Sequence, residues 1–355
     1  MEKIRFDNFV SLNRGFDLPD DKIIEGKYPV IASTSIKAYH NQFKVKAPIV
    51  VTGRSGSLGK VQYVDEDGWP LNTALYAKDF HGNNPKYVYY FLQTMHLEQY
   101  NAGAGVPTLN QNHLHSLKIL IHEVPTQQKI ATILSTYDNL IQNYKKQIEA
   151  LQTAASELYK EWFVRFRFPG YQTAKFENGI PKGWKIEKLG TLANISTGKC
   201  NREDAEEDGI YPLFDRSQEI KKSNEWIKDC EAIIVPGEGT SFIPRYYKGK
   251  FNLHQRCYCV EPKYPDFGKF LFYVLMLNRK YFLSVATGAT VPSLRYNNFA
   301  SMKFVLPEMF LCNNFNKIAD DIFAKIDNLN KQITNLTQQR DLLLPRLMSG
   351  KLEVE

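Results

Sequence analysis

The segment GAGVPTL at residues 103–109 returns in altered form as GATVPSL at residues 288–294. Outward from this pair, other segments recur in the same order, and their offset drifts by only a few residues. Self-similarity over so long a period predicts two copies of one domain that together span nearly the whole chain. The further pairs are 4–15 with 186–198, 28–30 with 211–213, 49–53 with 233–237, and 71–77 with 253–259.

Each copy is followed by a run of apolar and aromatic residues at alternating steps of four and three. This spacing is typical of the seam of a coiled coil. An ordinary amphipathic core helix is the alternative. One charged residue, Arg340, interrupts the second run. The seam residues are Ile130, Leu134, Tyr137, Ile141, Tyr144, Ile148, Leu151, Ala155, Leu158 and Trp162 in the first run, and Phe315, Ala319, Ile322, Ile326, Leu329, Ile333, Leu336, Arg340 and Leu343 in the second.

The connection between the copies predicts how the helices run. Only about 20 residues, including the breaker Pro169-Gly170, separate Trp162 from the start of the second copy near Trp184. The second helix must then run back along the first, which predicts an antiparallel pair with a globular domain at each end, a pseudo-two-fold dumbbell. We expect an α+β protein with two tandem repeated α/β domains. Its expected parts are a first globular domain at 1–125, a helical spacer at 126–165, a linker at 166–183, a second globular domain at 184–308 and a C-terminal helical spacer at 309–352.

Composition and charge limit the function classes. Lys and Arg outnumber Asp and Glu by 45 to 38, which gives a formal net charge of +7 and a pI near 8.9. This balance suits a polyanionic partner but does not require one. The first residues lack the apolar core of a secretory signal, and no run reaches the roughly 18 apolar residues of a membrane span. We therefore expect a soluble, cytoplasmic protein with no membrane partner.

The five cysteines form an odd set in the second half of the chain and indicate reduced thiols. Cys257 and Cys259, beside His254, suggest a zinc site. A structural zinc site typically uses Cys pairs two to four residues apart and a second pair of ligands, and the one-residue gap fits neither requirement. A Cys-x-Cys strand without metal is the plainer interpretation, and we expect no metal site.

The glycine-rich loop TGRSGSLGK at residues 52–60 superficially resembles a phosphate-binding P-loop. That motif needs four residues between its first glycine and its Gly-Lys pair, with Ser or Thr next. Here five residues intervene and Val61 follows. The segment is interpreted either as a tight turn whose free amides, with Arg54 and Lys60, face a DNA phosphate, or as a plain hairpin turn.

Two further motif searches also argue against catalysis. Pro19-Asp20 followed by Glu25-Gly26-Lys27 spells a restriction-nuclease signature, whose acids must converge on magnesium. The four residues between them leave little room for two strands and a turn, so a solvated loop is the better interpretation. The nearest match to an adenine-methyltransferase motif, NNPK at 83–86, lacks the second proline and the aromatic residue.

Three further segments are diagnostic, and they are LYKEWFVRF at 158–166, GIPKGW at 179–184 and LLLPRLMSGKL at 342–352. With them the chain resembles a known family, the specificity subunits of Type I restriction-modification systems, from about residue 4 to residue 353. The loops at 52–60 and 236–247 are also similar to the family's. There is one departure from the family pattern. The second copy has a Gly-Ile-Pro segment before Trp184, whereas the first copy has no equivalent segment and starts almost at Met1.

The resemblance implies that each globular copy is a target recognition domain, which reads one half of a bipartite site in double-stranded DNA. It implies that the helices set the gap and dock two methyltransferase subunits. Those subunits use S-adenosylmethionine to methylate adenine, and the restriction motor-nuclease subunits of such systems use ATP and magnesium. We therefore expect no catalytic residue and no cofactor in this chain. A coiled-coil adaptor that binds proteins without DNA specificity is the alternative, and it predicts no salt-dependent affinity for DNA.

Candidate DNA contacts are polar or basic residues in the repeated loops, because Arg, Lys, Asn, Gln and Ser read base edges and Lys and Arg bind phosphates. These residues are chosen by their position in loops. They are Lys37, Arg54, Ser55, Lys60 and Asn110 in the first domain, and Arg216, Arg245, Lys248, His254, Arg256 and Arg295 in the second.

Overall fold

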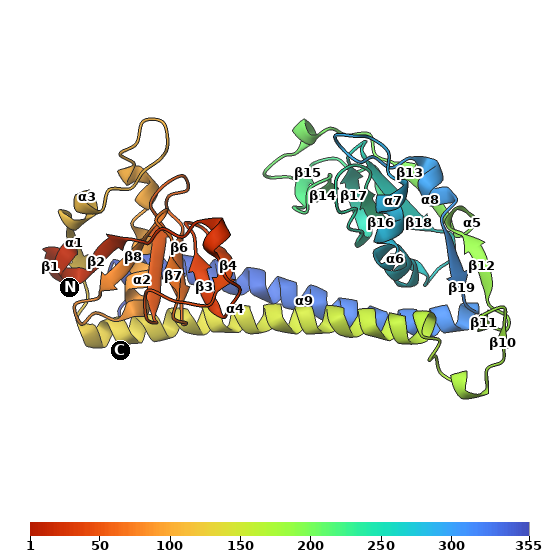
Figure 1. Ribbon diagram of the computed structural model, residues 1–355, viewed down its shortest axis with the longest axis horizontal. Coiled ribbons are helices and arrows are strands. Elements are labelled where there is room, and N and C mark those ends of the chain that lie inside the picture. Colours follow the sequence, from red (N-terminus) through yellow and green to blue (C-terminus); the bar gives the residue numbers. More distant parts are fainter. Residues whose placement is uncertain (355) are drawn as a thin grey trace. The chain divides into compact units, whose positions relative to one another are not determined.

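The computed structural model describes residues 1–354. The chain divides into two compact units, each of which is described by itself. Unit 1 comprises Met1–Lys145 and the chain from Asn330 onward, and unit 2 comprises Lys146–Leu329. Both units mix strands with helices (Figure 1), as the expected α+β fold requires.

Unit 1 is built on a four-stranded antiparallel sheet in the order β2-β8-β5-β6. The IVVTG segment forms β5, which is buried along its whole length between two neighbours, as an uninterrupted β-branched run favours. A three-stranded sheet, β4-β3-β7, and the pair β1-β9 complete the unit. The bounds are β1 (Glu2–Arg5), α1 (Phe6–Phe9), β2 (Ser11–Arg14), η1 (Asp20–Lys22), β3 (Tyr28–Ile31), β4 (Ile36–His40), β5 (Ile49–Gly53), β6 (Val61–Val64), β7 (Trp69–Pro70), β8 (Ala74–Asp79), α2 (Pro85–Thr94), η2 (Leu97–Tyr100), α3 (Gln111–His115) and β9 (Lys118–Ile121).

The core of unit 1 lies between its main sheet and the long helices. The N-terminus of helix α2 is capped by Asn84, whose side chain accepts a hydrogen bond from the Tyr87 amide, and Pro85 occupies the first turn. Its apolar face then joins the ends of the two long helices in one cluster. That cluster includes Phe6, Phe9, Tyr87, Tyr90 and Leu97 of the globular part, Ile130 and Leu134 of α4 (Val124–Tyr159), and Leu344 and Leu347 of α9 (Met309–Met348).

Unit 2 is built on a six-stranded sheet in the order β13-β18-β16-β17-β14-β15. Strand β14 runs parallel to β17, and the other pairs are antiparallel. The bounds are the π-turn η3 (Lys160–Val164), η4 (Tyr171–Thr173), β10 (Phe176–Glu177), β11 (Ile180–Pro181), β12 (Lys185–Lys188), α5 (Leu189–Leu192), β13 (Ala193–Thr197), η5 (Arg202–Asp204), β14 (Tyr211–Phe214), β15 (Lys221–Ser223), β16 (Lys228–Pro236), β17 (Arg245–Leu253), β18 (Cys257–Pro262), α6 (Gly268–Leu277), α7 (Arg279–Val285), α8 (Tyr296–Ala300) and β19 (Lys303–Leu306).

The repeat predicted from sequence is present in the strand pairing of both units. The first strand of each copy pairs antiparallel with its last strand, as β1 with β9 and as β12 with β19. The copies differ in one strand. In unit 2 the single strand β17 bonds both β16 and β14, whereas in unit 1 the corresponding chain is split into β6 and β7 around the turn at residues 65–68. The second copy thereby gains one continuous sheet.

The predicted helical seams are buried or half-buried at every position, including Arg340. Within unit 1 the helices run antiparallel, since Ile130 clusters with Leu347 while Asp138, later in α4, pairs with Arg340, earlier in α9. Within unit 2 the rings of Tyr159 and Trp162 both pack on Phe315, with centroids 5.6 and 6.2 Å apart. Each helix segment therefore packs on its partner segment and on the globular core of its own unit. Among residues 1–354, no helix is long and apolar enough to cross a membrane.

Candidate nucleic-acid interface

In unit 1 the loop after β5, at residues 54–60, is hydrogen-bonded through its backbone to two other segments. The amides of Arg54 and Ser55 donate to the Thr73 carbonyl, at 2.8 and 3.1 Å, and the Gly56 amide donates to Pro107 at 2.9 Å. The expectation that this loop offers free amides to a phosphate is therefore corrected for these three residues, because their N–H groups already have protein acceptors. Arg54 Nη1 also donates to the Asn72 carbonyl at 3.3 Å. Ser55 is half-buried in the same loop, and Lys60, at its end, is exposed.

The remaining candidates of unit 1 lie outside that loop, Lys37 on β4 and Asn110 next to Leu109, whose amide donates to the Arg54 carbonyl. Lys37, on β4, is exposed and forms an ion pair with Asp20, Nζ to Oδ1 2.5 Å. Asn110 accepts a hydrogen bond from the Asn112 amide at 2.9 Å, and it therefore caps helix α3. This contact favours a structural role for Asn110 over base reading, whereas Lys37 remains a predicted contact.

In unit 2 three of the candidates meet at one place. Arg216 Nη1 lies 2.7 Å from Oε2 of Glu238, and Arg256 Nη1 lies 2.5 Å from Oε1 of the same carboxylate. His254 is buried, and its Nδ1 accepts from the Arg256 amide at 2.9 Å. Burial lowers the pKa of His254, so the ring stays neutral near pH 7, as an Nδ1 acceptor requires. The sequence search missed Glu238, because it considered only basic and neutral polar residues.

A hollow of about 300 Å³ that lies wholly within unit 2 is bordered by Arg216, Glu238 and His254. The hollow opens where β14 and β16 end and β18 begins, so three strand ends supply its walls. Arg216 gives this hollow hydrogen-bond donors, and the carboxylates of Asp215 and Glu238 give it acceptors. Arg256 is joined to the lining through its ion pair with Glu238. It is lined by Asp215, Arg216, Ser217, Glu238, Gly239, His254 and Val291.

Arg245 braces the wall of this hollow. Its Nη1 and Nη2 donate to the carbonyls of Ser217 and Asp215, at 2.8 and 2.5 Å, and its guanidinium lies over the Phe214 ring at 5.0 Å. Burial lowers the pKa of Arg245. Its Nε has no hydrogen-bond partner among the described residues. These contacts favour a bracing role for Arg245 over DNA contact, since the ends of its guanidinium are already bound.

A buried ion pair braces the same wall. Lys221 Nζ lies 2.7 Å from Oδ2 of Asp215, and both side chains are largely buried. Burial alone would raise the pKa of Asp215, but hydrogen bonds from Lys221 and Ser217 lower it to about 2. The remaining candidates of unit 2, Lys248 on β17 and Arg295 just before α8, are exposed and stay predicted contacts.

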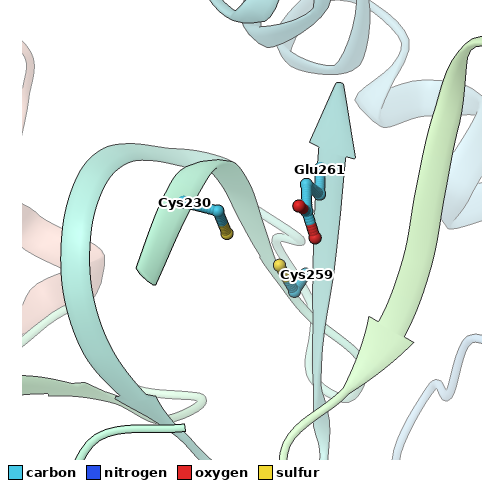
Figure 2. A group of neighbouring side chains, drawn as sticks. All are labelled: Cys230, Cys259 and Glu261. Atoms are coloured by element: carbon cyan, nitrogen blue, oxygen red, sulfur yellow. The ribbon is translucent and has the colours of Figure 1, made fainter. Parts of the chain in front are cut away.

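Three possible metal ligands converge elsewhere in unit 2. The ligand atoms of Cys230, Cys259 and Glu261 lie within 4.8 Å of one another (Figure 2), and they belong to β16 and β18. Two thiolates and a carboxylate suit a zinc ion with water as the fourth ligand. Against this, the ammonium of Lys228 lies 3.3 Å from Glu261, and the pKa of Cys259 is raised by its hydrogen bond with Cys230 and by burial.

This set of possible ligands differs from the one considered in the sequence analysis, since it does not include His254 or Cys257. Cys257 instead belongs, with Cys259, to a buried cluster that contains Phe214 and Phe251. Sequence spacing could not reveal the Cys230 group, because its members come from two strands that are far apart along the chain.

Comparison with known proteins gives consistent matches along the chain. A family model described as the Type I restriction modification DNA specificity domain matches residues 2–153 and 181–339. The chain is similar to the specificity subunit of the MjaIX Type I restriction enzyme of Methanocaldococcus jannaschii, with 27% identity over 92% of the chain and 82% of that protein. It is 24% identical to the MjaVIII specificity subunit of the same organism, over 100% of the chain and 93% of that protein.

A solved structure shares the fold. The chain superposes on the S subunit of a Type I restriction-modification system from M. genitalium with a TM-score of 0.66 and 20% identity, over 98% of the chain and 96% of that structure. The match supports the arrangement of strands and helices described above, and at this identity it carries no information about individual contact residues.

Proposed function

The chain belongs to the Type I restriction-modification DNA specificity family, and on that basis we propose that it is the subunit that reads the DNA sequence in such an enzyme. In this proposal unit 1 and unit 2 each carry one target recognition domain, and each domain reads one half of a bipartite site in double-stranded DNA. The adaptor alternative is set aside, because two separate stretches of the chain match a DNA specificity domain.

The observation that carries the proposal is that both domains build the same loop junction. The Leu109 amide donates to the Arg54 carbonyl in unit 1, and the Leu294 amide donates to the Gly237 carbonyl in unit 2, both at 2.8 Å. In each unit this bond ties the repeated Val-Pro loop to the loop that leaves the central strand. Most of the candidate contacts lie on or beside these junctions, and loops fixed on a rigid sheet are suited to binding.

We further propose that this chain carries no catalytic group of its own. Two methyltransferase subunits that use S-adenosylmethionine would supply methyl transfer, and motor-nuclease subunits that use ATP and Mg²⁺ would supply cleavage. Support comes from the sequence. The P-loop and nuclease signatures fail on spacing, and the methyltransferase motif lacks its second proline and its aromatic residue. The long helices α4 and α9 would set the gap between half-sites and dock the methyltransferase subunits.

A methyl-transfer assay with purified components tests this proposal. The chain is incubated with duplex DNA and labelled S-adenosylmethionine, alone and with its methyltransferase subunits. We expect no transfer by the chain alone, and transfer to a split site when both components are present. Methylation by the isolated chain, or the same site preference from the methyltransferase without the chain, would contradict it.

A further inference from the structure

The hydrogen bonds of the two loop junctions give an exact residue correspondence between the units. Gly237 donates to the Arg256 carbonyl as Arg54 donates to Thr73, each at 2.8 Å. Thr73 in unit 1 therefore corresponds to Arg256 in unit 2, and Arg54 corresponds to Gly237. This corrects by one residue the pairing of 49–53 with 233–237 and of 71–77 with 253–259 that was expected from the sequence. The next residues along the loops are Ser55 and Glu238, and each is followed by a glycine whose amide donates to the proline of the Val-Pro loop.

The parallel strand pairs extend this correspondence. Ile31 lies opposite Pro70 in unit 1, and Phe214 lies opposite Leu253 in unit 2. Two residues beyond these strand ends stand Ser33 and Arg216. Three equivalent positions are thus filled by Ser33, Ser55 and Thr73 in unit 1, and by Arg216, Glu238 and Arg256 in unit 2.

The same three positions carry short hydroxyl side chains in unit 1 and charged side chains in unit 2. Ser33 is buried, and its hydroxyl donates to the Thr73 carbonyl at 2.8 Å. In unit 2 the Glu238 carboxylate, 15% exposed, bridges Arg216 and Arg256, whose side chains are 47% and 55% exposed. The acid is therefore sheltered, while both guanidinium groups reach solvent.

We propose that Arg216, Glu238 and Arg256 form a reading cluster of the second domain that takes a G·C base pair, in which Glu238 both orients the two guanidinium groups and accepts from the cytosine. Guanine presents two acceptors, O6 and N7, to an arginine, and its partner cytosine presents an amino donor to a carboxylate. A cluster of two guanidinium groups and one carboxylate matches that pattern of acceptors and donor. The inference rests on the proposed DNA-reading function.

Phosphate oxygens are the other acceptors that arginine recognises, and the structure disfavours them at this cluster. Glu238 removes one of the two positive charges, and its carboxylate would repel a phosphate. The carboxylate instead fixes the direction of each guanidinium, which a base contact needs more than a phosphate contact does.

The backbone around the cluster is held in place while the arginine tips stay accessible. Arg256 is fixed through its amide by His254 and through its carbonyl by Gly237. The residues on either side of Arg216 are fixed by Arg245, which binds the carbonyls of Asp215 and Ser217. These contacts give the buried His254 and Arg245 a function in the proposal, which is to position the two reading residues.

The test uses the full chain assembled with its methyltransferase subunits in cells, followed by methylome sequencing of the wild type, E238Q and R256Q. We expect one half-site to contain a G·C pair whose recognition relaxes in both variants, with discrimination falling roughly 5- to 150-fold, while the other half-site stays unchanged. E207Q, which makes the same charge change at an exposed position of unit 2, should leave that base pair intact.

Each other result has a defined meaning. A uniform loss of affinity for all sequences, with a shallower salt dependence for purified R256Q on duplex DNA, would indicate phosphate binding and overturn the base-reading proposal. An unchanged motif in E238Q and R256Q, or a half-site without any G·C pair, would overturn it as well. If the wild type directs no bipartite methylation, the proposed function itself fails. Circular dichroism of each variant shows whether it folds. Where methylation is lost, fluorescence anisotropy with purified protein and labelled duplex DNA compares the DNA affinities of the variant and the wild type.

Discussion

The charged residue in the second helical seam offers a sharp test of how unit 1 is stabilised. Arg340 Nη1 lies 2.5 Å from Oδ1 of Asp138, and the Tyr90 hydroxyl donates to the other oxygen of Asp138, also at 2.5 Å. Arg340 additionally binds Asp341 at 2.7 Å. Burial alone would lower the pKa of Arg340, but its hydrogen bonds to the two carboxylates raise it. The guanidinium is therefore charged at every accessible pH.

The cost of R340M follows from the exposure of this pair. The side chains of Arg340 and Asp138 are 22% and 25% exposed. Breaking a fully buried pair costs about 3–5 kcal/mol, whereas an exposed pair contributes under about 1 kcal/mol. Because this pair is mostly buried and Tyr90 still satisfies one oxygen of Asp138, we expect R340M to lower the free energy of unfolding of unit 1 by about 2 kcal/mol. The double variant R340M/D138L should recover most of that loss, because it leaves no buried charge unpaired.

Hydrogen exchange measured by mass spectrometry resolves the effect by unit. Peptides covering residues 130–145 and 336–348 in R340M should exchange up to about 30-fold faster than in the wild type, since about 2 kcal/mol corresponds to that factor. Peptides covering 309–329, in unit 2, serve as the internal control and should be unchanged. A change under about 0.5 kcal/mol, or an equal change in both units, would refute the view that this pair stabilises unit 1.

Three further predictions follow from the ion pair of unit 2, the repeat and the helices. Because the pKa of Asp215 falls to about 2 from an unfolded value of 3.8, its ion pair stabilises unit 2 above pH 4, and that contribution is lost as the pH falls toward 2. D215N should therefore lower the stability at pH 7 and flatten the acid dependence in thermal melts followed from pH 2 to 7. An acid dependence that D215N leaves unchanged would contradict this prediction. Replacing residues 1–125 with the head of another family member should change one half-site and spare the other in methylome sequencing, so that a change in both or in neither would contradict independent reading. Inserting seven residues near Tyr144 keeps the heptad phase and adds about 10 Å, which corresponds to at most about three base pairs of gap; the shift should be smaller because the added turns are unpaired. A four-residue insertion adds about 6 Å and turns the following residues about 40° off phase, so it should shift the gap less or weaken assembly. An active seven-residue variant with an unaltered gap would rule out the helices as a ruler.

The repeated architecture could be predicted from sequence because it depends on local patterns. The β-branched runs that became β5 and β16 are flanked by glycine or proline in both copies, and the heptad spacing marks the side chains that each helix buries. In unit 1 the chain equivalent to β17 is split into β6 and β7. This split was not predicted, because it depends on which residues pair across strands. The charged seam residue Arg340 was noted, but its partner Asp138 lies in the other helix and no local pattern links them.

The candidate site could be predicted only in part, since its roles are set by contacts between distant segments. Arg216, His254 and Arg256 were singled out. The first two line one hollow, and Arg256 contacts that lining through His254 and Glu238. Arg245 and Asn110 looked equivalent to them in sequence, yet the first binds two carbonyls and the second caps a helix. Glu238 could have been found only by asking what holds two neighbouring arginines in place.

The central claim is that this chain decides which DNA sequence is methylated. The most direct measurement is methylome sequencing of cells that express its methyltransferase subunits with and without this chain. We predict a bipartite motif, two short specified half-sites around an unspecified gap, that is methylated only when the chain is present. Methylation of the same motif without the chain, or a single continuous motif that depends on it, would contradict the account.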